Sequence, residues 1–251
     1  MIKKLLLLSL SSLLAVNAHA DLLGATAGVA AWQYDISGSA RYQSNSSNDD
    51  IDLNDDLGYD DDSSVFFYAA FEHFIPLIPN VKVVKTVIDS DANGTLSQSY
   101  SYGGLTYNVG EAVTSELSID QTDFTFYYSP LDTVANIDFG LTIRHLDASA
   151  KITGAVTGTE EADISGWIPL PYLGVGIDLP FTGLSVAAEG SGLKFQGSHY
   201  YDFTIQARYD TPWFTGVNLG YRSIVLKIDD VDDAFADIEF SGPFIGVYAA
   251  F

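Results

Sequence analysis

Alternation of apolar and polar residues with a period of two dominates this chain and constrains its fold more than any other feature. Residues 201–210 (YDFTIQARYD) place Tyr, Phe, Ile, Ala and Tyr on one face and polar residues on the other. Residues 137–144, 173–179 and 122–128 repeat the pattern. Since successive side chains of a β-strand point to opposite faces, the pattern predicts strands with one apolar and one polar face, and an all-β fold.

The connections between these stretches fall into two classes that take turns along the chain. One class is short, apolar and proline-containing, and comprises residues 75–80, 129–136, 179–183 and 211–216. The other class is polar, and mostly longer and acidic, and comprises residues 43–63, 90–115, 157–162, 197–198 and 229–236. Short turns at one end and longer loops at the other are typical of outer-membrane barrels, whereas the loops of a soluble sandwich do not sort in this way.

Counting between the connections gives ten strands, an even number, as single-chain bacterial barrels have. The predicted fold class is therefore a closed antiparallel transmembrane β-barrel of ten strands, with short periplasmic turns and longer acidic extracellular loops. Several strands exceed the ~9–11 residues that cross a bilayer, so some hairpins should project beyond it. The predicted spans are 25–42, 64–74, 81–90, 116–128, 137–156, 162–178, 184–196, 199–210, 217–229 and 237–251.

Four places fit this pattern poorly. The spans 25–42 and 81–90 are apolar on both faces in part, so their register stays open. Pro169 and Pro171 remove ladder donors, which predicts a bulge or a position above the membrane. The alternation also slips near Arg144, at either a bulge or the membrane boundary.

The N-terminus has the three parts of a secretory signal peptide. Lys3 and Lys4 are followed by an apolar core, residues 5–16, and by the small-x-small site Ala18-His19-Ala20. The apolar core is shorter than the ~20 residues of a transmembrane helix. We expect a cleaved signal peptide, residues 1–20, and one barrel domain, residues 21–251; an N-terminal membrane anchor is the alternative.

Charge and cysteine content narrow the function classes. The chain has 33 acidic and 11 basic residues, which argues against a nucleic-acid partner, because phosphates require a basic face. There is no cysteine, so the sequence offers neither disulfides nor a thiolate metal site. Gly-rich phosphate loops, a G-x-S-x-G elbow and an H-E-x-x-H zinc motif do not occur in the sequence.

The chain ends in an alternating strand that finishes at Phe251. This ending resembles the last strand of bacterial outer-membrane proteins, which implies that Phe251 is an assembly signal for the barrel assembly machinery. More narrowly, the chain resembles a family of small proteobacterial outer-membrane β-barrels of unassigned function, on residues 56–59 (DLGY), 72–76 (EHFIP), 79–80 and the C-terminal strand. The resemblance implies the outer membrane of a Gram-negative bacterium, with membrane lipids and lipopolysaccharide as partners. It supplies no activity and leaves the oligomeric state open.

The polar faces of the strands predict a charged lumen. Charges of both signs there form either an ion-pair network that plugs the lumen or a constriction that selects solutes. A ten-stranded barrel is barely wider than an eight-stranded one, which side chains fill, so a plug is favoured. Because buried charges must be paired, we expect Glu72, Asp202, Arg208 and Arg222 to contact opposite charges. The inward residues are predicted as Glu72, Asp123, Asp138, Arg144, Asp178, Glu189, Asp202, Arg208 and Arg222.

Histidines carry the only enzymatic hypothesis. A lipid or peptide hydrolase at the outer rim would use His145 or His199 with a nearby Ser or Asp. No His-x-Ser or Asp-x-His pair occurs, so these residues and His73 are predicted to anchor the barrel at the membrane interface. We therefore assign no catalytic residue and expect a non-catalytic structural protein or a narrow, plugged channel. A small passive porin-like channel and a barrel enzyme are the alternatives.

Two acidic features suggest cations. Residues 89–97 match the start of a calcium loop, with Asp89, Asp91 and Asn93 as ligands and Ca²⁺ as the only cofactor suggested. The twelfth position is Tyr100 rather than Glu, and Asn93-Gly94 fits a turn equally well. The acidic loops 49–62 and 229–237 predict solvated faces, or divalent ions shared with lipopolysaccharide phosphates.

Overall fold

The computed structural model describes residues 23–44, 46–231 and 233–251, so the predicted signal peptide lies outside the described residues. No helix among the described residues is long and apolar enough to span a bilayer. The elements of the described chain are β1 (Leu23–Tyr42), the 3-10 turn η2 (Ser47–Asp49), β2 (Ile51–Asp52), β3 (Asp62–His73), β4 (Asn80–Thr95), β5 (Tyr100–Tyr102), β6 (Leu105–Tyr107), β7 (Ala112–Asp132), β8 (Ala135–Gly154), β9 (Gly158–Leu179), β10 (Leu184–Phe195), β11 (Ser198–Asp210), β12 (Thr215–Val231) and β13 (Ala234–Ala250).

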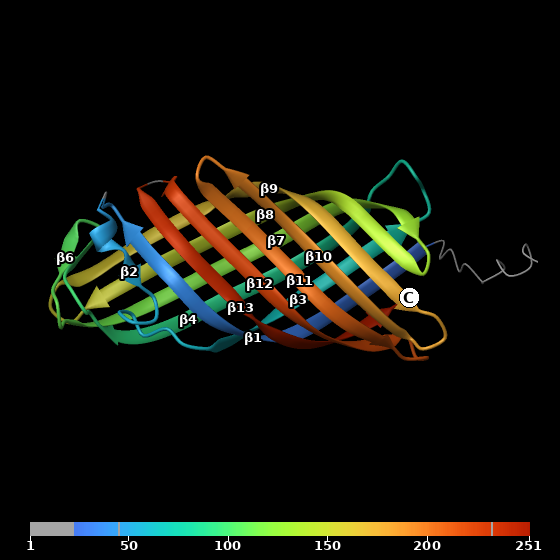
Figure 1. Cartoon of the computed structure of the whole chain (residues 1–251), viewed down its shortest axis with the longest axis horizontal. Helices are drawn as coiled ribbons and strands as arrows, with labels where there is room; N and C mark the ends of the chain where they lie inside the picture. The colour runs from blue at the N-terminus through green and yellow to red at the C-terminus, as the bar shows by residue number, and fades with distance from the viewer. Residues whose placement is uncertain (1–22, 45, 232) are drawn as a thin grey trace, which may run out of the picture.

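Ten long strands form a closed antiparallel barrel (Figure 1). Each long strand pairs with its neighbours in sequence, and β1 closes the ring by pairing with both β3 and β13. Trp32 of β1, for example, lies opposite Ser64 on one side and Phe244 on the other. The predicted fold class and the predicted ten strands are confirmed. Closure leaves the ring of strands without an edge where β13 meets β1, as lipid requires.

The two ends of the barrel differ in their connections. At the turn end lie the short connections 74–79, 133–134, 180–183 and 211–214, together with Leu23 and Phe251. At the loop end lie the described residues 43–44, 46–61, 96–111, 155–157, 196–197 and 233. The predicted loop 90–115 was too long, because β4 continues to Thr95 and β7 begins at Ala112.

The surface polarity of the barrel reverses part-way along its strands. On β8, Ile137, Phe139 and Leu141 point outward and are exposed, whereas Arg144 is buried inside. Further toward the loop end, Leu146 is buried inside and Asp147 is exposed outside. The ladder between β8 and β9 shows no register shift there. The slip in the sequence pattern near Arg144 is therefore a change of surroundings and not a bulge.

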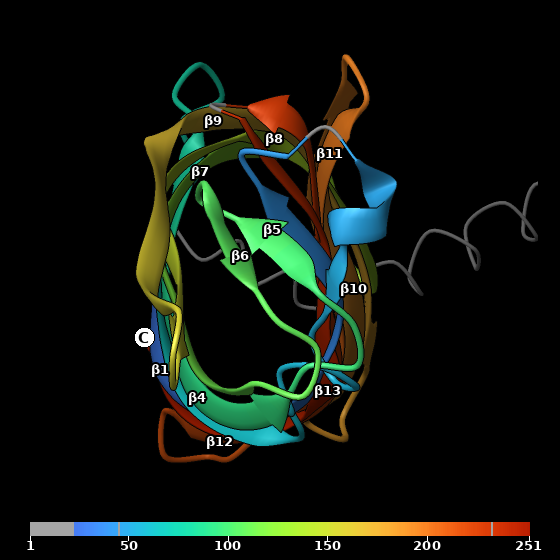
Figure 2. The ribbon, with the colours of Figure 1, turned by 90° about the vertical axis from the view of Figure 1, so that its left-hand side faces the viewer.

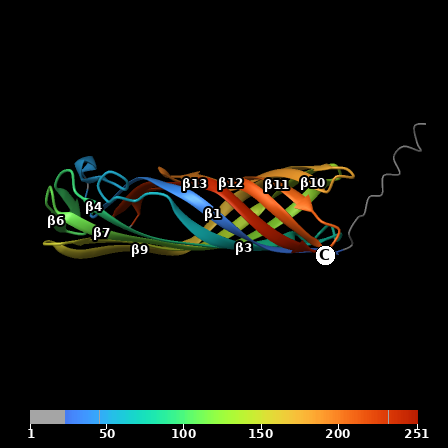
Figure 3. The same cartoon turned by 90° about the horizontal axis from the view of Figure 1, so that it is seen from below.

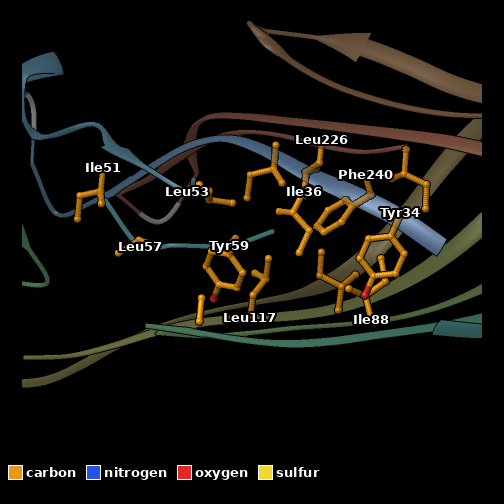
Figure 4. Close-up of a cluster of buried hydrophobic side chains, with 14 of the residues drawn as sticks. Tyr34, Ile36, Ile51, Leu53, Leu57, Tyr59, Ile88, Leu117, Leu226 and Phe240 are labelled. Carbon is orange, nitrogen blue, oxygen red and sulfur yellow. The ribbon is translucent and has the colours of Figure 1, made fainter. Parts of the chain in front are cut away.

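The loop-end half contains an apolar core, shown in Figure 4. Connection 43–61 folds inward, so that Leu53, Leu57 and Tyr59 pack with strand residues such as Ile36 and Leu117. The β5–β6 hairpin lies across the mouth of the barrel (Figure 2). The loop-end half thus resembles the interior of a soluble protein, with apolar side chains inside and polar side chains outside.

Strand β9 carries a free edge toward the loop end. It pairs with β10 only from Tyr172 to Leu179, whereas it pairs with β8 along its whole length. Figure 3 shows β9 reaching the loop end while β10 and β11 stop short. The backbone N–H of Asp178 points to β8, where it donates to Val134 at 2.8 Å, and N–H directions alternate along a strand.

This alternation explains the two prolines of β9. The missing N–H groups of Pro169 and Pro171 would point away from β8, toward the free edge, so no ladder bond is lost. The predicted bulge is wrong, because the β8–β9 ladder runs through both prolines without a register shift. Proline on an unpaired edge also prevents pairing with another strand.

Candidate functional site

A network of four buried charges crosses the lumen. Arg144 on β8 donates from Nε and Nη2 to the Asp123 carboxylate on β7 at 2.6 and 2.5 Å. Its Nη2 also donates to Asp202 Oδ2 on β11 at 2.7 Å. Arg222 on β12 donates to both oxygens of Asp202, at 3.0 and 2.8 Å. Two arginines and two aspartates from opposite walls are thereby joined into one group of balanced formal charge.

The side chains of this network are almost completely buried. Arg144 is 0% exposed and Arg222 is 3% exposed. Tyr200 lies under the Arg144 guanidinium at 4.4 Å, and Thr86 Oγ1 accepts from Arg222 Nη1 at 2.9 Å. Charges withdrawn from water in this way are stable only when they are paired and hydrogen-bonded.

An apolar seal lies on the loop-end side of the network. Trp32 packs on Tyr34 in a tilted arrangement and Tyr34 packs edge-to-face on Phe240, with ring centroids 4.7 and 5.8 Å apart. Ile88 and other fully buried side chains complete the layer. This layer packs with the apolar side chains of Ile51, Leu53, Leu57 and Tyr59 in one cluster (Figure 4). Solutes would have to displace both the ion pairs and a packed core to cross.

A cavity of about 910 Å³ lies on the other side of the network. Asp202 and Arg222 line its inner end, and Glu72, Asp132 and Asp178 line it near the turn end. We call this cavity the vestibule. The vestibule thus extends from the network to the turn end of the barrel.

Comparison with solved structures bears on the fold. The chain is similar to the outer membrane protease OmpT from Escherichia coli, with a TM-score of 0.51 and 9% identity over 90% of this chain and 97% of that chain. The translocator domain of the autotransporter NalP from Neisseria meningitidis matches with a TM-score of 0.43 and 11% identity over 100% of this chain and 95% of that chain. No protein-family model and no curated protein matches the chain. At these identities the likeness to OmpT shows the fold alone.

The outward side chains of the turn-end half indicate that this part of the barrel is surrounded by lipid. Leu173, Phe203, Leu219 and Val247 belong to an apolar belt on four strands of the closed ring. A closed barrel with such a belt satisfies its backbone internally and presents hydrocarbon to lipid. The chain is an outer-membrane β-barrel. In such barrels the short turns face the periplasm, so the vestibule of this barrel opens toward that side.

All nine residues predicted to line the lumen point inward. Asp123, Arg144, Asp202 and Arg222 form the network, and Glu72, Asp138, Asp178, Glu189 and Arg208 line the vestibule. The expected ion pairing holds for Asp202 and Arg222. It is wrong for Glu72 and Arg208, which form no ion pair with the described residues: Glu72 accepts from Tyr127 Oη at 2.6 Å, and Arg208 lies over the Tyr248 ring at 4.2 Å. Both residues line the vestibule, where no opposite charge of the described residues lies within ion-pair distance of them.

Sequence reasoning missed Lys82. Its ammonium pairs with Glu189 inside the vestibule and lies 4.7 Å over the Tyr172 ring. Residues 81–88 (VKVVKTVI) are apolar on both faces, so the alternation there does not show which lysine points inward. The register with β7, whose inward residues alternate clearly, contains the missing signal: Lys82 lies opposite Thr125.

His145 and His199 lie on the outer wall. His145 Nδ1 is 3.3 Å from Asp147, and its ring packs on Trp167 with centroids 4.5 Å apart. His199 packs on Tyr201. Aromatic and imidazole rings near the edge of an apolar belt are typical of the membrane interface.

The cation motif adopts a different structure from the predicted one. Asp89, Asp91 and Asn93 lie in β4, paired with β7, and not in a calcium loop or a turn. A Cβ at Gly94 would overlap the backbone of Asp56 and Leu57, so this glycine lets connection 43–61 dock on β4. Within the described residues no group of three or more His, Asp and Glu side chains could hold a metal ion.

Two acids hold the loop-end connections in place. Burial acts to raise the pKa of Asp56, but hydrogen bonds from Ser97 and Tyr100 outweigh it and keep the pKa below its ordinary value. Glu111 accepts hydrogen bonds from the backbone of Val156, Asn108 and Thr157 at 2.9, 3.1 and 2.8 Å. These bonds, with one from the Thr157 hydroxyl, lower the pKa of Glu111 to about 2. Both carboxylates thus stabilise the closed arrangement of the loops as anions.

Proposed function

We propose that this barrel is a non-catalytic, structural membrane protein whose lumen is closed to solutes. The observation that carries the proposal is the Asp123–Arg144–Asp202–Arg222 network with the apolar seal beyond it. The network joins strands from opposite walls and so braces the barrel inside the membrane. The loop-end half extends this closed scaffold beyond the apolar belt.

A passive channel is the first alternative, and the packing argues against it. An aqueous pore needs a continuous polar path, whereas here Trp32, Tyr34 and Phe240 are each at most 1% exposed beyond the network. In planar bilayers we expect the purified protein to give low conductance or none. A large and stable single-channel conductance would contradict the proposal and favour a porin-like function.

An enzyme at the outer rim is the second alternative, and the hydrogen bonding there argues against it. Asp147 lies between His145 and Ser165: His145 Nδ1 is 3.3 Å from its carboxylate, and the Ser165 hydroxyl donates to the same carboxylate. A serine nucleophile needs the histidine itself as its base, so this order does not activate Ser165.

Histidine substitution tests the non-catalytic assignment. Wild-type protein, His145→Ala and His199→Ala would be compared in assays of lipid A remodelling and of surface proteolysis. We expect no activity in any of the three. An activity of the wild type that either substitution abolishes would show that the barrel is an enzyme.

Assembly and lipid partners extend the proposal. Phe251 lies at the turn end, where its backbone exchanges hydrogen bonds with Ala25 at 2.8 and 3.0 Å and its ring stacks on Phe214. This position next to the seam between β1 and β13 supports a role of the last strand in closure by the barrel assembly machinery. The acidic outer wall of the loop-end half supports contact with lipopolysaccharide through divalent cations.

A further inference from the structure

One wall of the vestibule carries polar atoms that lack partners. Among the described residues, Arg208 Nε on β11 and Tyr68 Oη on β3 are buried donors without an acceptor, Asn218 Oδ1 on β12 is a buried acceptor without a donor, and all three residues line the vestibule. Asn218 is only 2% exposed. Buried polar atoms are nearly always hydrogen-bonded, so the two orphaned donors on this wall indicate a site for a ligand that accepts hydrogen bonds.

Two glycines allow the aromatic rings of this wall to lie against the backbone. A Cβ at Gly28 would overlap the Tyr68 ring, and a Cβ at Gly216 would overlap the Tyr248 ring. Because both positions are glycine, the two rings lie against the barrel wall and leave the vestibule open. Arg208 stacks on Tyr248 at 4.2 Å, which fixes its guanidinium without neutralising it. A fixed, unpaired guanidinium is suited to bind a carboxylate.

A second pole of the vestibule has the opposite charge. The Glu72 and Asp138 carboxylates accept only from neutral hydroxyls, those of Tyr127 and Ser129, each at 2.6 Å. Lys82, the basic residue beside them, is already paired with Glu189. Its ammonium also lies 3.3 Å from Tyr172 Oη and over that ring, and so shows how this wall holds an amine. This amine site on the same wall favours an organic ammonium as the partner of Glu72 and Asp138.

The distance between the poles sets the size of the ligand. Tyr68 and Glu72 both belong to β3 and are four residues apart, which corresponds to roughly 13 Å between their Cα atoms. An extended tripeptide spans roughly 10 Å, and the side chains at both poles reach into the gap. A simple anion would leave Glu72 and Asp138 uncompensated, and a simple cation would leave Arg208 unpaired.

We propose that the vestibule binds a small zwitterion of short-peptide size, with its carboxylate on Arg208 and Tyr68 and its ammonium on Glu72 and Asp138. The ligand enters from the turn end and cannot pass the network. The site therefore captures such a molecule on the periplasmic side. This inference goes beyond the structural role proposed above, and it holds whether or not the barrel has further partners.

Titration calorimetry with the purified barrel in detergent tests the proposal, with trialanine as the probe. We expect trialanine to bind, and N-acetyl-trialanine and trialanine amide each to bind at least about tenfold more weakly, the loss expected for one charge-assisted hydrogen bond. Absence of trialanine binding, or equal binding of either blocked peptide, would overturn the proposal. The blocked peptides need no protein variant, so this comparison does not depend on refolding.

Substitutions then locate the two poles. Arg208→Gln should weaken trialanine at least about tenfold and abolish the difference between trialanine and its amide. Glu72→Gln should abolish the difference between trialanine and its N-acetyl form. Tyr68→Phe removes only one hydroxyl and should also weaken binding. Glu116→Gln, on the outer wall of the loop-end half, is the matched control and should bind like wild type. Unchanged discrimination in both Arg208→Gln and Glu72→Gln would overturn the assignment of the poles.

Discussion

The two halves of the barrel use the same strands and the same two-residue period, but their interiors have opposite character. In the turn-end half, polar side chains such as Asp138 and Arg208 point inward and apolar ones such as Phe139 point to lipid. In the loop-end half, Ile88 points inward and Lys85 points outward, where it pairs with Asp120. The change occurs along continuous strands without a register shift in β8–β9.

This difference shows that alternation determines the strands, whereas the surroundings determine which face is apolar. Outside the bilayer water solvates the outer wall, and the hydrophobic effect fills the interior. Inside the bilayer lipid contacts the outer wall, so the interior can hold charges as long as they are paired or wet. The Arg144 network lies where the two regimes meet, between the polar vestibule and the apolar core.

The largest expected loss of stability comes from breaking a buried ion pair, and an exposed ion pair provides the comparison. Asp202→Asn removes the common partner of Arg144 and Arg222 and leaves two buried cations short of charge. The loss should be about 3–5 kcal/mol of stability, measured by the temperature at which the folded band disappears in heat-modifiable gels. Asp237→Asn, which breaks the exposed pair with Lys227 on the outer wall, is the control and should be nearly silent. Equal effects of the two substitutions would contradict a stabilising network.

A charge on the outer wall tests where the apolar belt ends. Leu219 and Ser223 both point outward on β12, four residues apart, on either side of the proposed boundary. Leu219→Arg should destabilise the barrel by about 2–4 kcal/mol, because it places a charge against lipid. Ser223→Arg should have a much smaller effect in the same unfolding assay. Similar losses at both positions would move the boundary toward the loop end.

Acid should loosen the loop-end half before the turn-end half. The pKa of Glu111 is lowered to about 2, so its stabilising contribution is complete above the ordinary value of 4.5 and is lost as the pH falls toward 2. Between those values the connections 96–111 and 155–157 should become susceptible to an acid protease. Glu111→Gln should show the same susceptibility at neutral pH. Protection that persists in Glu111→Gln would contradict this role.

The smallest expected effect concerns the free edge of β9. Pro169→Ala should change stability by no more than ~1 kcal/mol, since the restored N–H has no strand to pair with. Asn136→Pro on β8 is not a matched control, because Asn136 also lines the vestibule. Ile177→Pro is better matched: Ile177 is also outward on β9, but its N–H points to β10 where the two strands pair. It should destabilise strongly, and a silent Ile177→Pro would contradict the assigned N–H directions.

The strand order and the lumen residues could be predicted because a membrane strand displays its lipid side directly in the sequence. Phe139 and Leu141 next to Asp138 already show which face is which. Residues 81–88 carry no such contrast, so Lys82 needed the observed register. The sequence predicted that Asp202 contacts an opposite charge, but not that its partners are two arginines. Whether Arg208 pairs with an acidic residue depends on distances across the barrel, which the sequence does not contain.

Tertiary contacts account for the remaining differences. Residues 89–94 (DSDANG) read locally as a calcium loop or a turn, but Gly94 is used for the close approach of Asp56 and Leu57. Pro169 and Pro171 read as a bulge, but they lie on an edge that exists only because β10 is short. In both cases the residue type reflects a structural requirement that is set by another segment of the chain: connection 43–61 for Gly94, and the short β10 for the two prolines.

Thiol accessibility tests the closed lumen most directly. Because the chain contains no cysteine, only the introduced thiol can react. Ser191→Cys places a thiol in the vestibule, and Ser115→Cys places one beyond the network, where Ser115 is 1% exposed and its hydroxyl has no partner among the described residues. The folded protein in detergent should react at residue 191 with a hydrophilic maleimide and remain unreactive at residue 115 until it is unfolded. Comparable labelling of both positions in the folded protein would show a continuous aqueous path and contradict the closed barrel.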